Sequence, residues 1–205
     1  MSDGERTMPN IRDLRQSDAS AVDALALCAF EQFKGAYDDW PAFRAKIATL
    51  SSLAEVGEII VAEAGGKIVG AVAYVGPGAP KAAFFRAEWA IMRMLVVSPA
   101  SRGLGLGRAL LEECFRRATR DGASVFALHT SEVMQVALAM YQRMGFQWLS
   151  SAPAIHGVDY GVYVKPLDSY TQTGRGIDGL DVLENSSQAK TASQPASQVA
   201  LAPLK

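Results

Sequence analysis

Three glycines at alternate positions, Gly103, Gly105 and Gly107, follow an apolar run and open a leucine-rich stretch. Glycine has no Cβ, so a glycine-rich backbone can approach a bulky anion closely. The first N–H groups of a helix have no partner within the helix, and the helix dipole places partial positive charge there. A glycine segment that opens a helix can therefore bind a phosphate group. We call residues 102–108, which begin and end with arginine, the glycine loop.

Other phosphate-binding loops have a different spacing. The dinucleotide-binding fingerprint G-x-G-x-x-G requires two residues before its last glycine, whereas one residue separates Gly105 from Gly107. A Walker A loop requires Gly-Lys-Ser or Gly-Lys-Thr, which this loop does not contain. The remaining alternative is a plain glycine-rich turn between a strand and a helix.

Two segments carry a resemblance to a known family. The glycine loop begins Arg-Gly-Leu-Gly-Leu-Gly and is similar to the acetyl-CoA signature Arg/Gln-x-x-Gly-x-Gly/Ala of GNAT N-acetyltransferases. Downstream, Ala137, Tyr141, Gly145 and Phe146 resemble the A…Y…GF motif of the same family. The two segments occur in the family order, with one expected helix and one expected strand between them.

The resemblance covers about residues 11–166 and implies acetyl-CoA as cosubstrate, with no metal. It implies that the backbone amides of the glycine loop hold the pyrophosphate of CoA. The strand before the loop would bond the pantetheine arm through its main chain, and a bulge would splay that strand from the next one. The residues implied in cofactor binding are Leu95, Val96, Val97, Arg102, Gly103, Leu104, Gly105, Leu106, Gly107 and Arg108.

Tyr141 is the catalytic residue that the resemblance implies, because the family tyrosine protonates the departing thiolate. Attack of an amine on a thioester needs a neutral amine, a donor for the carbonyl oxygen and an acid for the thiolate. A tyrosine with a pKa of ~10 is protonated at neutral pH and can be that acid. From helix periodicity alone, Tyr141 could instead be a core residue.

The general base is open. Histone-acetyltransferase-type members carry a glutamate where this sequence has Ile91, which cannot accept a proton. Glu88, His129 and His156 are the candidate bases, and ordered water is the alternative.

A frequent family asparagine, which contacts the cofactor, is also replaced. It stands about seven residues before the tyrosine, where this sequence has Met134. Thr130 or Ser131 could supply that polar contact instead.

In this family the acceptor pocket usually comes from the region of the first two helices and the loop between the last two strands. Aromatic and acidic side chains gather in the first of these regions: Phe33, Tyr37, Asp38, Asp39 and Trp40. Adjacent aspartates beside aromatic rings could receive a cationic amine. The alternative is a solvated loop between two helices.

Hydrophobic periodicity indicates the elements that position these residues. Apolar and β-branched runs predict strands at 11–15, 58–64, 67–75, 88–97, 124–130, 146–149 and 161–165. Helical spacing predicts one helix whose buried face is Ala21, Ala24, Leu25 and Cys28, and further helices at 43–53, 104–120 and 135–144. Gly65-Gly66 predicts a tight hairpin turn. The fold class expected is α/β (α+β), a GNAT fold with a mixed, mostly antiparallel, twisted sheet of six or seven strands and about four helices.

Composition sets the remaining expectations for this chain of 205 residues with a net charge of −1. No apolar run approaches the ~18 residues of a membrane span, and the polar start lacks a signal-peptide core, so a cytoplasmic location is expected. The two cysteines, Cys28 and Cys114, fit a reducing compartment and are expected to be buried. The domain boundaries expected are a flexible start at 1–9, the acetyltransferase domain at 10–168 and a disordered polar tail at 169–205, with a short helix conceivable at 179–184.

The resulting hypothesis is transfer of an acetyl group from acetyl-CoA to a primary amine of a small molecule or a protein. Two alternatives stay open: a non-catalytic acyl-CoA-binding regulator on the same fold, and an acetyltransferase toxin that acts on aminoacyl-tRNA. The near-zero net charge does not favour a nucleic-acid partner. The resemblance also implies a homodimer as one assembly.

Overall fold

The computed structural model describes residues 9–167, which form one seven-stranded sheet in the order β1-β2-β3-β4-β5-β7-β6. The strands are β1 (Asn10–Asp13), β2 (Glu58–Ala64), β3 (Lys67–Val75), β4 (Ala90–Val97), β5 (Val125–Thr130), β6 (Gln147–Ile155) and β7 (Val158–Pro166). Neighbouring strands are antiparallel except β4 and β5, which are parallel. The predicted fold class is therefore confirmed. The expected flexible start, disordered tail and conceivable helix at 179–184 lie outside the described residues.

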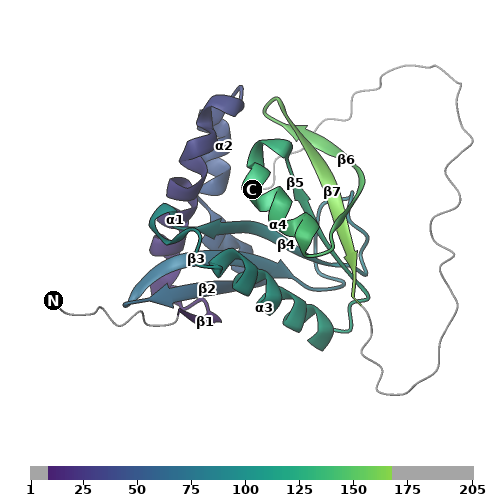
Figure 1. The fold of residues 1–205 in the computed structure, drawn as a ribbon, viewed down its shortest axis with the longest axis horizontal. Helices are drawn as coiled ribbons and strands as arrows, with labels where there is room; N and C mark the ends of the chain where they lie inside the picture. Colours follow the sequence, from purple (N-terminus) through teal and green to yellow (C-terminus); the bar gives the residue numbers. More distant parts are fainter. Residues whose placement is uncertain (1–8, 168–205) are drawn as a thin grey trace, which may run out of the picture. The chain divides into compact units, whose positions relative to one another are not determined.

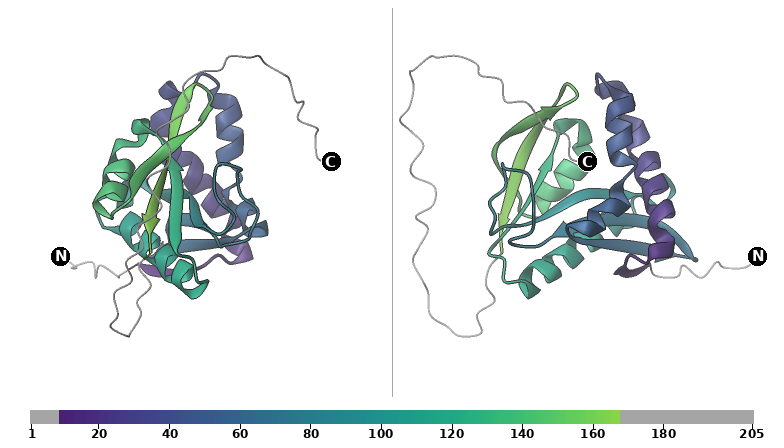
Figure 2. Two further views of the ribbon diagram at one scale, coloured as in Figure 1. Left: turned by 90° about the vertical axis from the view of Figure 1, so that its right-hand side faces the viewer. Right: turned by 180° about the vertical axis from the view of Figure 1, so that it is seen from behind.

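Four α-helices cover the two faces of the sheet within residues 9–167 (Figure 2). They are α1 (Ala19–Phe30), α2 (Trp40–Ile47), α3 (Leu106–Arg120) and α4 (Gln135–Arg143). Helix α1 packs on one face of β2, β3 and β4. Helices α3 and α4 pack on the opposite face, where the larger core cluster lies.

The hairpin between β2 and β3 forms where Gly65-Gly66 predicted it. Both glycines have positive φ, 55° and 73°, which tight hairpin turns require and which side chains with a Cβ disfavour. Both strands also have the predicted bounds. Local turn chemistry and β-branched runs therefore determine this part of the sheet.

Of the predicted buried face of α1, Leu25 is confirmed, whereas Ala21, Ala24 and Cys28 are exposed. The buried residues are Val22, Leu25, Ala26 and Ala29. Cys28 is exposed, contrary to expectation, whereas Cys114 on α3 is buried as expected. Small apolar residues occur almost all around α1, so the sequence allows more than one apolar stripe, and the larger Val22 goes to the core.

Three predicted elements differ most from the structure in their bounds, and the others outside the β2–β3 hairpin differ by one or two residues at one or both ends. Helix α2 begins at Trp40 with a proline in its first turn and ends at Ile47, and a 3-10 segment, η3 (Leu50–Glu55), follows. Strands β6 and β7 are longer than predicted and join through the two-residue turn His156-Gly157, with φ of 46° and 82°. Strand β6 lies at the edge of the sheet and is mostly exposed, so its hydrophobic pattern is weak.

The sheet opens between β4 and β5. Only Ala90↔Phe126 and Ile91↔Ala127 are paired, after which the two strands diverge. Figure 1 shows β1–β4 running across the view while β5 and β7 stand nearly upright. A bulge in β4 places two residues, Met94 and Leu95, opposite one residue of β3, and Met94 has a positive φ of 56°. The bulge and the splay implied by the family resemblance are therefore present.

An ionic cluster at the C-terminal half of α3 holds this helix to strands β1 and β2. Arg117 is buried and binds Asp13 at 2.5 Å, Glu113 at 3.0 Å and also Glu58. These carboxylates come from β1, β2 and α3 itself, so one guanidinium joins three elements. At the other end of α3, Gly107 lies beside Leu95 of β4 and Met140 of α4.

Candidate active site

The glycine loop presents a continuous run of free backbone donors. Gly103 and Gly105 each have φ of +77°, which favours glycine, and α3 begins at the next residue, Leu106. The first intrahelical bond runs from Ala109 N–H to Gly105 O at 3.0 Å. No described residue accepts a hydrogen bond from the N–H groups of residues 103–108. This is a helix N-terminus prepared for an anion.

Gly107 lies where the loop faces β4 and α4. A Cβ at this position would meet Met140 Sδ at 3.6 Å and Leu95 Cδ2 at 3.9 Å, which are ordinary contacts. The fold by itself therefore tolerates a side chain here. This agrees with the family signature, which has glycine or alanine at this position.

The two arginines of the loop have partners within the protein. Arg102 donates to Gln32 Oε1 at 3.0 Å and to the Ala29 carbonyl at 3.3 Å, which ties the loop to the end of α1. Arg108 is exposed and pairs with Glu112 at 2.8 Å on the next turn of α3. Both guanidinium groups are therefore engaged, and the free donors of the loop are its main-chain N–H groups.

The end of β4 also presents free main-chain groups toward the opening. Ser98 N–H donates to Val69 O at 2.8 Å, so Val97, opposite Gly70, directs its own N–H and C=O away from β3. Val96 alternates with it, pairs with β3 and is buried, so it positions the strand. An extended ligand could add to this edge as a further strand does.

Tyr141 is the buried residue of α4, and its ring packs edge-on against Phe146 at 5.9 Å. Burial, and secondarily the nearby Cys114, raise the pKa of Tyr141, so the phenol is protonated at neutral pH. Its hydroxyl has no hydrogen bond to a described residue. Within residues 9–167, the fully buried side-chain polar atoms without a hydrogen bond are His129 Nδ1 and His156 Nε2. The Tyr141 hydroxyl is not one of them, so its oxygen is not fully buried. The phenol is therefore an available donor.

His129 lies across the opening from Arg93. Each is two residues beyond the last pair, Ile91↔Ala127, so the two share one face of the sheet. Aromatic rings surround the imidazole: Phe84 at 5.5 Å, Phe85 at 5.9 Å and Tyr160 at 5.4 Å. Burial, and then the charge of Arg93, lower the pKa of His129 to about 4. His129 is therefore a neutral imidazole at pH 7.

The structure does not bring Glu88 to this site. It is exposed on the segment before β4, and its charge acts on Lys81. Ile91 is buried in the last paired position of β4. The polar candidates after β5 are engaged locally: Thr130 donates to Met134 Sδ at 3.7 Å, and Ser131 accepts from Val133 N–H at 3.3 Å. Of the predicted bases near the opening, His129 is the best placed.

Aromatic residues before and within α2 pack against the β6–β7 hairpin. The hydroxyls of Tyr37 and Tyr160 are 2.6 Å apart, and Tyr37 stacks on Phe43 at 3.8 Å. Asp38 N–H donates to the carbonyl of His156 at 2.9 Å, in the turn of the hairpin. This contact joins the two regions that the resemblance implied for the acceptor.

Asp39 has a structural role. Its carboxylate accepts from Ala42 N–H at 2.9 Å and caps the N-terminus of α2. The sequence indicates that Asp38 and Asp39 could both receive a cationic amine. The cap opposes this role for Asp39, because its carboxylate is already used by α2. Asp38 lies against the hairpin turn, because a Cβ on Gly157 would be 1.9 Å from its Oδ2.

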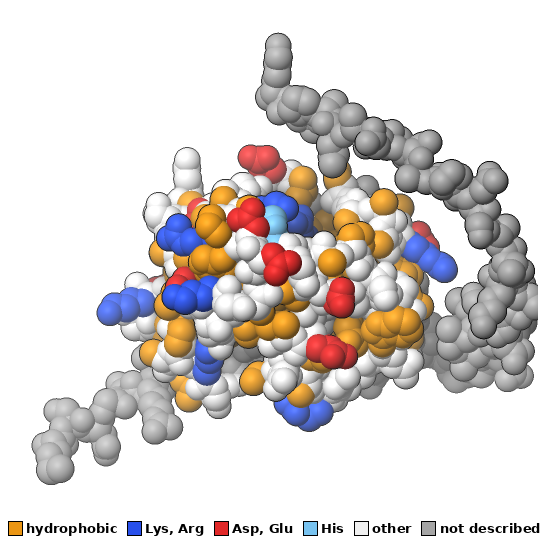
Figure 3. Space-filling view, turned by 90° about the horizontal axis from the view of Figure 1, so that it is seen from above, with side chains coloured by type: hydrophobic (Ala, Val, Ile, Leu, Met, Phe, Trp, Pro, Cys, Tyr) orange, Lys and Arg blue, Asp and Glu red, His pale blue; other side chains and the backbone are white. Residues whose placement is uncertain are grey.

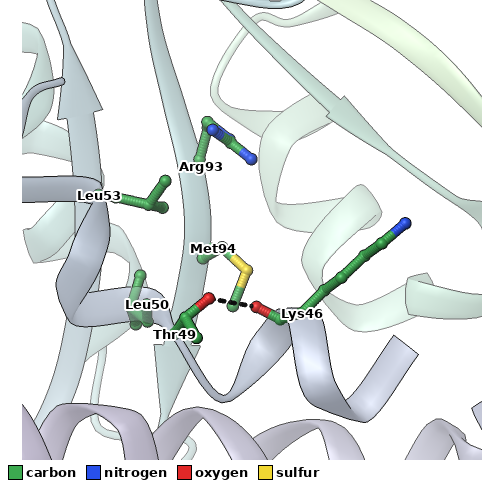
Figure 4. Close-up of a pocket in the computed structure, with 6 residues that line it drawn as sticks. All are labelled: Lys46, Thr49, Leu50, Leu53, Arg93 and Met94. Atoms are coloured by element: carbon green, nitrogen blue, oxygen red, sulfur yellow. Dashed lines mark hydrogen bonds between the residues drawn. The ribbon is translucent and has the colours of Figure 1, made fainter. Parts of the chain in front are cut away.

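A pocket of about 220 Å³ lies beside the bulge, and we call it the β4 pocket (Figure 4). Its lining residues are Lys46, Thr49, Leu50, Leu53, Arg93 and Met94. Sequence reasoning missed it, because α2, the η3 segment and β4 are far apart in the chain. The one signal was an arginine within the apolar strand 90–97. The face seen from above Figure 1 carries both acidic and basic side chains among hydrophobic ones (Figure 3).

The comparisons with known proteins agree with this geometry. The model of the acetyltransferase (GNAT) family matches residues 20–146, more than half of the chain. The chain belongs to the GNAT family. It is 36% identical to "Probable N-acetyltransferase family 8 member 5" of Mus musculus over 99 residues. This match covers 48% of the chain and 42% of that protein. It is 37% identical to N-acetyltransferase family 8 member 3 of Rattus norvegicus over 87 residues. This match covers 42% of the chain and 37% of that protein. The chain thus spans less than half the length of these curated relatives.

Solved GNAT structures have the same fold. The PaiA N-acetyltransferase of Thermoplasma acidophilum in complex with coenzyme A has a TM-score of 0.63 at 16% identity, covering 78% of this chain and 100% of that one. The Salmonella typhimurium protein YncA with its cofactor acetyl-CoA has a TM-score of 0.58 at 19% identity, covering 82% of this chain and 99% of that one. No helix within residues 9–167 is long and apolar enough to cross a membrane.

Proposed function

We propose that this GNAT protein transfers an acetyl group from acetyl-CoA to the nitrogen of a primary amine. The observation that carries the proposal is the run of free N–H groups of residues 103–108 beside the splayed end of β4. Family membership supports it, as do the named acetyltransferase relatives and the neighbours that hold acetyl-CoA or coenzyme A.

The cofactor contacts follow from the free backbone groups. The N–H groups of the glycine loop from Gly103 to Arg108 would hold the pyrophosphate, assisted by the dipole of α3. The N–H and C=O of Val97 would bond the pantetheine arm, with Leu95 beside it near Gly107. The side chain of Arg102 would hold the loop to α1, and Val96 would hold the strand to β3.

The chemistry then needs few protein groups. Acetyl-CoA, when bound, supplies an activated thioester. The acceptor nitrogen forms a bond to the acetyl carbon while the carbon–sulfur bond breaks. Tyr141 donates its phenolic proton to the departing sulfur and recovers a proton from solvent. The proton lost by the amine passes to water. His129 is neutral at pH 7, but its pKa of about 4 makes it a weak proton acceptor, so water is the better base.

Mass spectrometry of a mixed amine pool tests this function. The protein is incubated with acetyl-CoA and with amino acids, polyamines, an aminoglycoside and a peptide with a free N-terminus. We expect one class of amine to gain an acetyl group with equimolar release of CoA. Binding of acetyl-CoA without acetylation of any class would contradict the proposal and favour the non-catalytic regulator.

A further inference from the structure

Arg93 lines the β4 pocket and has no counter-charge within the part of the chain that the structure describes. It is partly buried on β4, just past the last residue paired with β5, and it has no ion pair or hydrogen bond with a described residue. Burial alone shifts its pKa, downward, so no carboxylate of the described residues lies close enough to oppose that shift. A guanidinium removed from water without a partner costs free energy.

The other partly buried or buried arginines within residues 9–167 form ion pairs with carboxylates. Arg12 binds the carboxylates of Asp18 and Glu63, each at 2.6 Å. Arg117 binds three carboxylates. Arg93 is also partly withdrawn from water, but no carboxylate from residues 9–167 pairs with it. A ligand that brings an anionic group would remove the cost.

The rest of the β4 pocket indicates the size and character of that ligand. Lys46 adds a second cation, and the basic ends of Arg93 and Lys46 extend to the same side (Figure 4). Leu50, Leu53 and Met94 provide apolar walls. The volume of about 220 Å³ lies below the range of roughly 300–1,000 Å³ typical of sites for drug-sized ligands. The pocket therefore fits a small molecule with an anionic end and an apolar part.

We propose that the β4 pocket binds the carboxylate of the acceptor through Arg93, so that the acceptor is a small primary amine of the amino-acid class. The planar guanidinium fork matches a carboxylate with two parallel hydrogen bonds. The bulge places Arg93 where β4 leaves β5, which is where the proposed function puts the thioester. This inference rests on that function and specifies its acceptor.

The test compares each of the twenty amino acids with its carboxamide, which keeps the amine and loses the negative charge. The proteins are wild type, Arg93→Met and the matched control Arg44→Met, whose arginine is exposed on α2. Initial rates of CoA release give kcat/KM for each acceptor. Calorimetry with acetyl-CoA on the same three proteins reports separately on the cofactor site.

We expect wild type to prefer the free acids of its best substrates by about 10- to 100-fold, the range for a hydrogen bond to a charged group. Arg93→Met should lose that preference, whereas Arg44→Met should keep it. The Kd for acetyl-CoA should change by less than about twofold in both variants.

Three outcomes would overturn the inference while acetyl-CoA still binds: equal or faster acetylation of the carboxamides, acetylation of neither series, or an unchanged preference in Arg93→Met. The comparison of acid with amide in wild type holds even if a variant fails to fold. Failure of wild type to bind acetyl-CoA would overturn the proposed function instead.

Discussion

The glycine loop and the β4 pocket flank the same opening in the sheet, but they are built from different groups. The loop is one continuous segment that presents main-chain N–H groups, while its arginine side chains bind other parts of the protein. The pocket gathers side chains from α2, η3 and β4. A main-chain site tolerates wide sequence variation around its glycines, whereas a side-chain site changes with each residue. This difference suits a fixed cofactor and a variable acceptor.

Replacing Tyr141 with phenylalanine should separate catalysis from binding most strongly. The phenol is buried, protonated and without a hydrogen-bond partner among residues 9–167, so its loss removes the proposed acid and leaves the loop intact. We expect kcat to fall roughly 100-fold, as for loss of a general acid. The Kd for acetyl-CoA should change by less than about twofold. Steady-state CoA release with saturating amine measures the first and calorimetry the second. An unchanged kcat would make Tyr141 a core residue only.

The pH dependence of stability should report the environment of His129. Its pKa is lowered to about 4 in the folded protein, against ~6.5 when unfolded. Between these values the unfolded state binds more protons, so stability falls as pH falls through this range. From pH 7.5 to 5, wild type should lose about 2 kcal/mol more than His129→Gln in the free energy of unfolding. Urea denaturation at both pH values measures this, and parallel losses would contradict the buried neutral imidazole.

Alanine at position 107 should stabilise the fold and leave cofactor binding nearly unchanged. The Cβ fits between Met140 and Leu95, and alanine in a helix is favoured over glycine by about 0.5–1 kcal/mol. Thermal denaturation should therefore show a small rise in Tm. The family signature has glycine or alanine at this position, so the Kd for acetyl-CoA should change by less than about twofold. A rise in Kd of about tenfold or more would contradict the alignment of the loop with that signature.

Substitutions at Asp39 should change the stability of α2 and not the binding of a cationic amine. Asp39→Ala removes the cap of α2 and should lower the free energy of unfolding by about 1 kcal/mol. Asp39→Asn keeps the cap and removes the charge, so both stability and the KM for the amine should stay near wild type. A rise in KM for Asp39→Asn at constant stability would restore Asp39 as a receptor for a cationic amine.

Much of the fold could be predicted because its signals are local. The β2–β3 hairpin depends on two glycines with positive φ between β-branched runs, and both features are visible in the sequence. The glycine loop is likewise one segment whose spacing and setting carry the chemistry. Strand β6 was predicted too short because an exposed edge strand has little hydrophobic pattern.

The β4 pocket could not be predicted for a different reason. Its walls depend on how residues 46–53 pack against β4, and that packing depends on the bulge at Met94. The use of Asp39 as a cap depends on where α2 begins, which was predicted three residues too late. Arg93 was visible as a charge in an apolar strand, but only the three-dimensional arrangement shows that it has no partner within residues 9–167.

Calorimetry with acetyl-CoA on wild type, Gly105→Glu and Gly78→Glu tests the central claim most directly. Gly105 and Gly78 have φ of +77° and +76°, and neither has an atom within 4 Å of an added Cβ, so the two variants carry matched backbone strain. We predict micromolar binding by wild type and by Gly78→Glu, and loss of binding by Gly105→Glu, whose carboxylate repels the pyrophosphate. Equal binding by both variants, or no binding by folded wild type, would contradict the assignment of the glycine loop to acetyl-CoA.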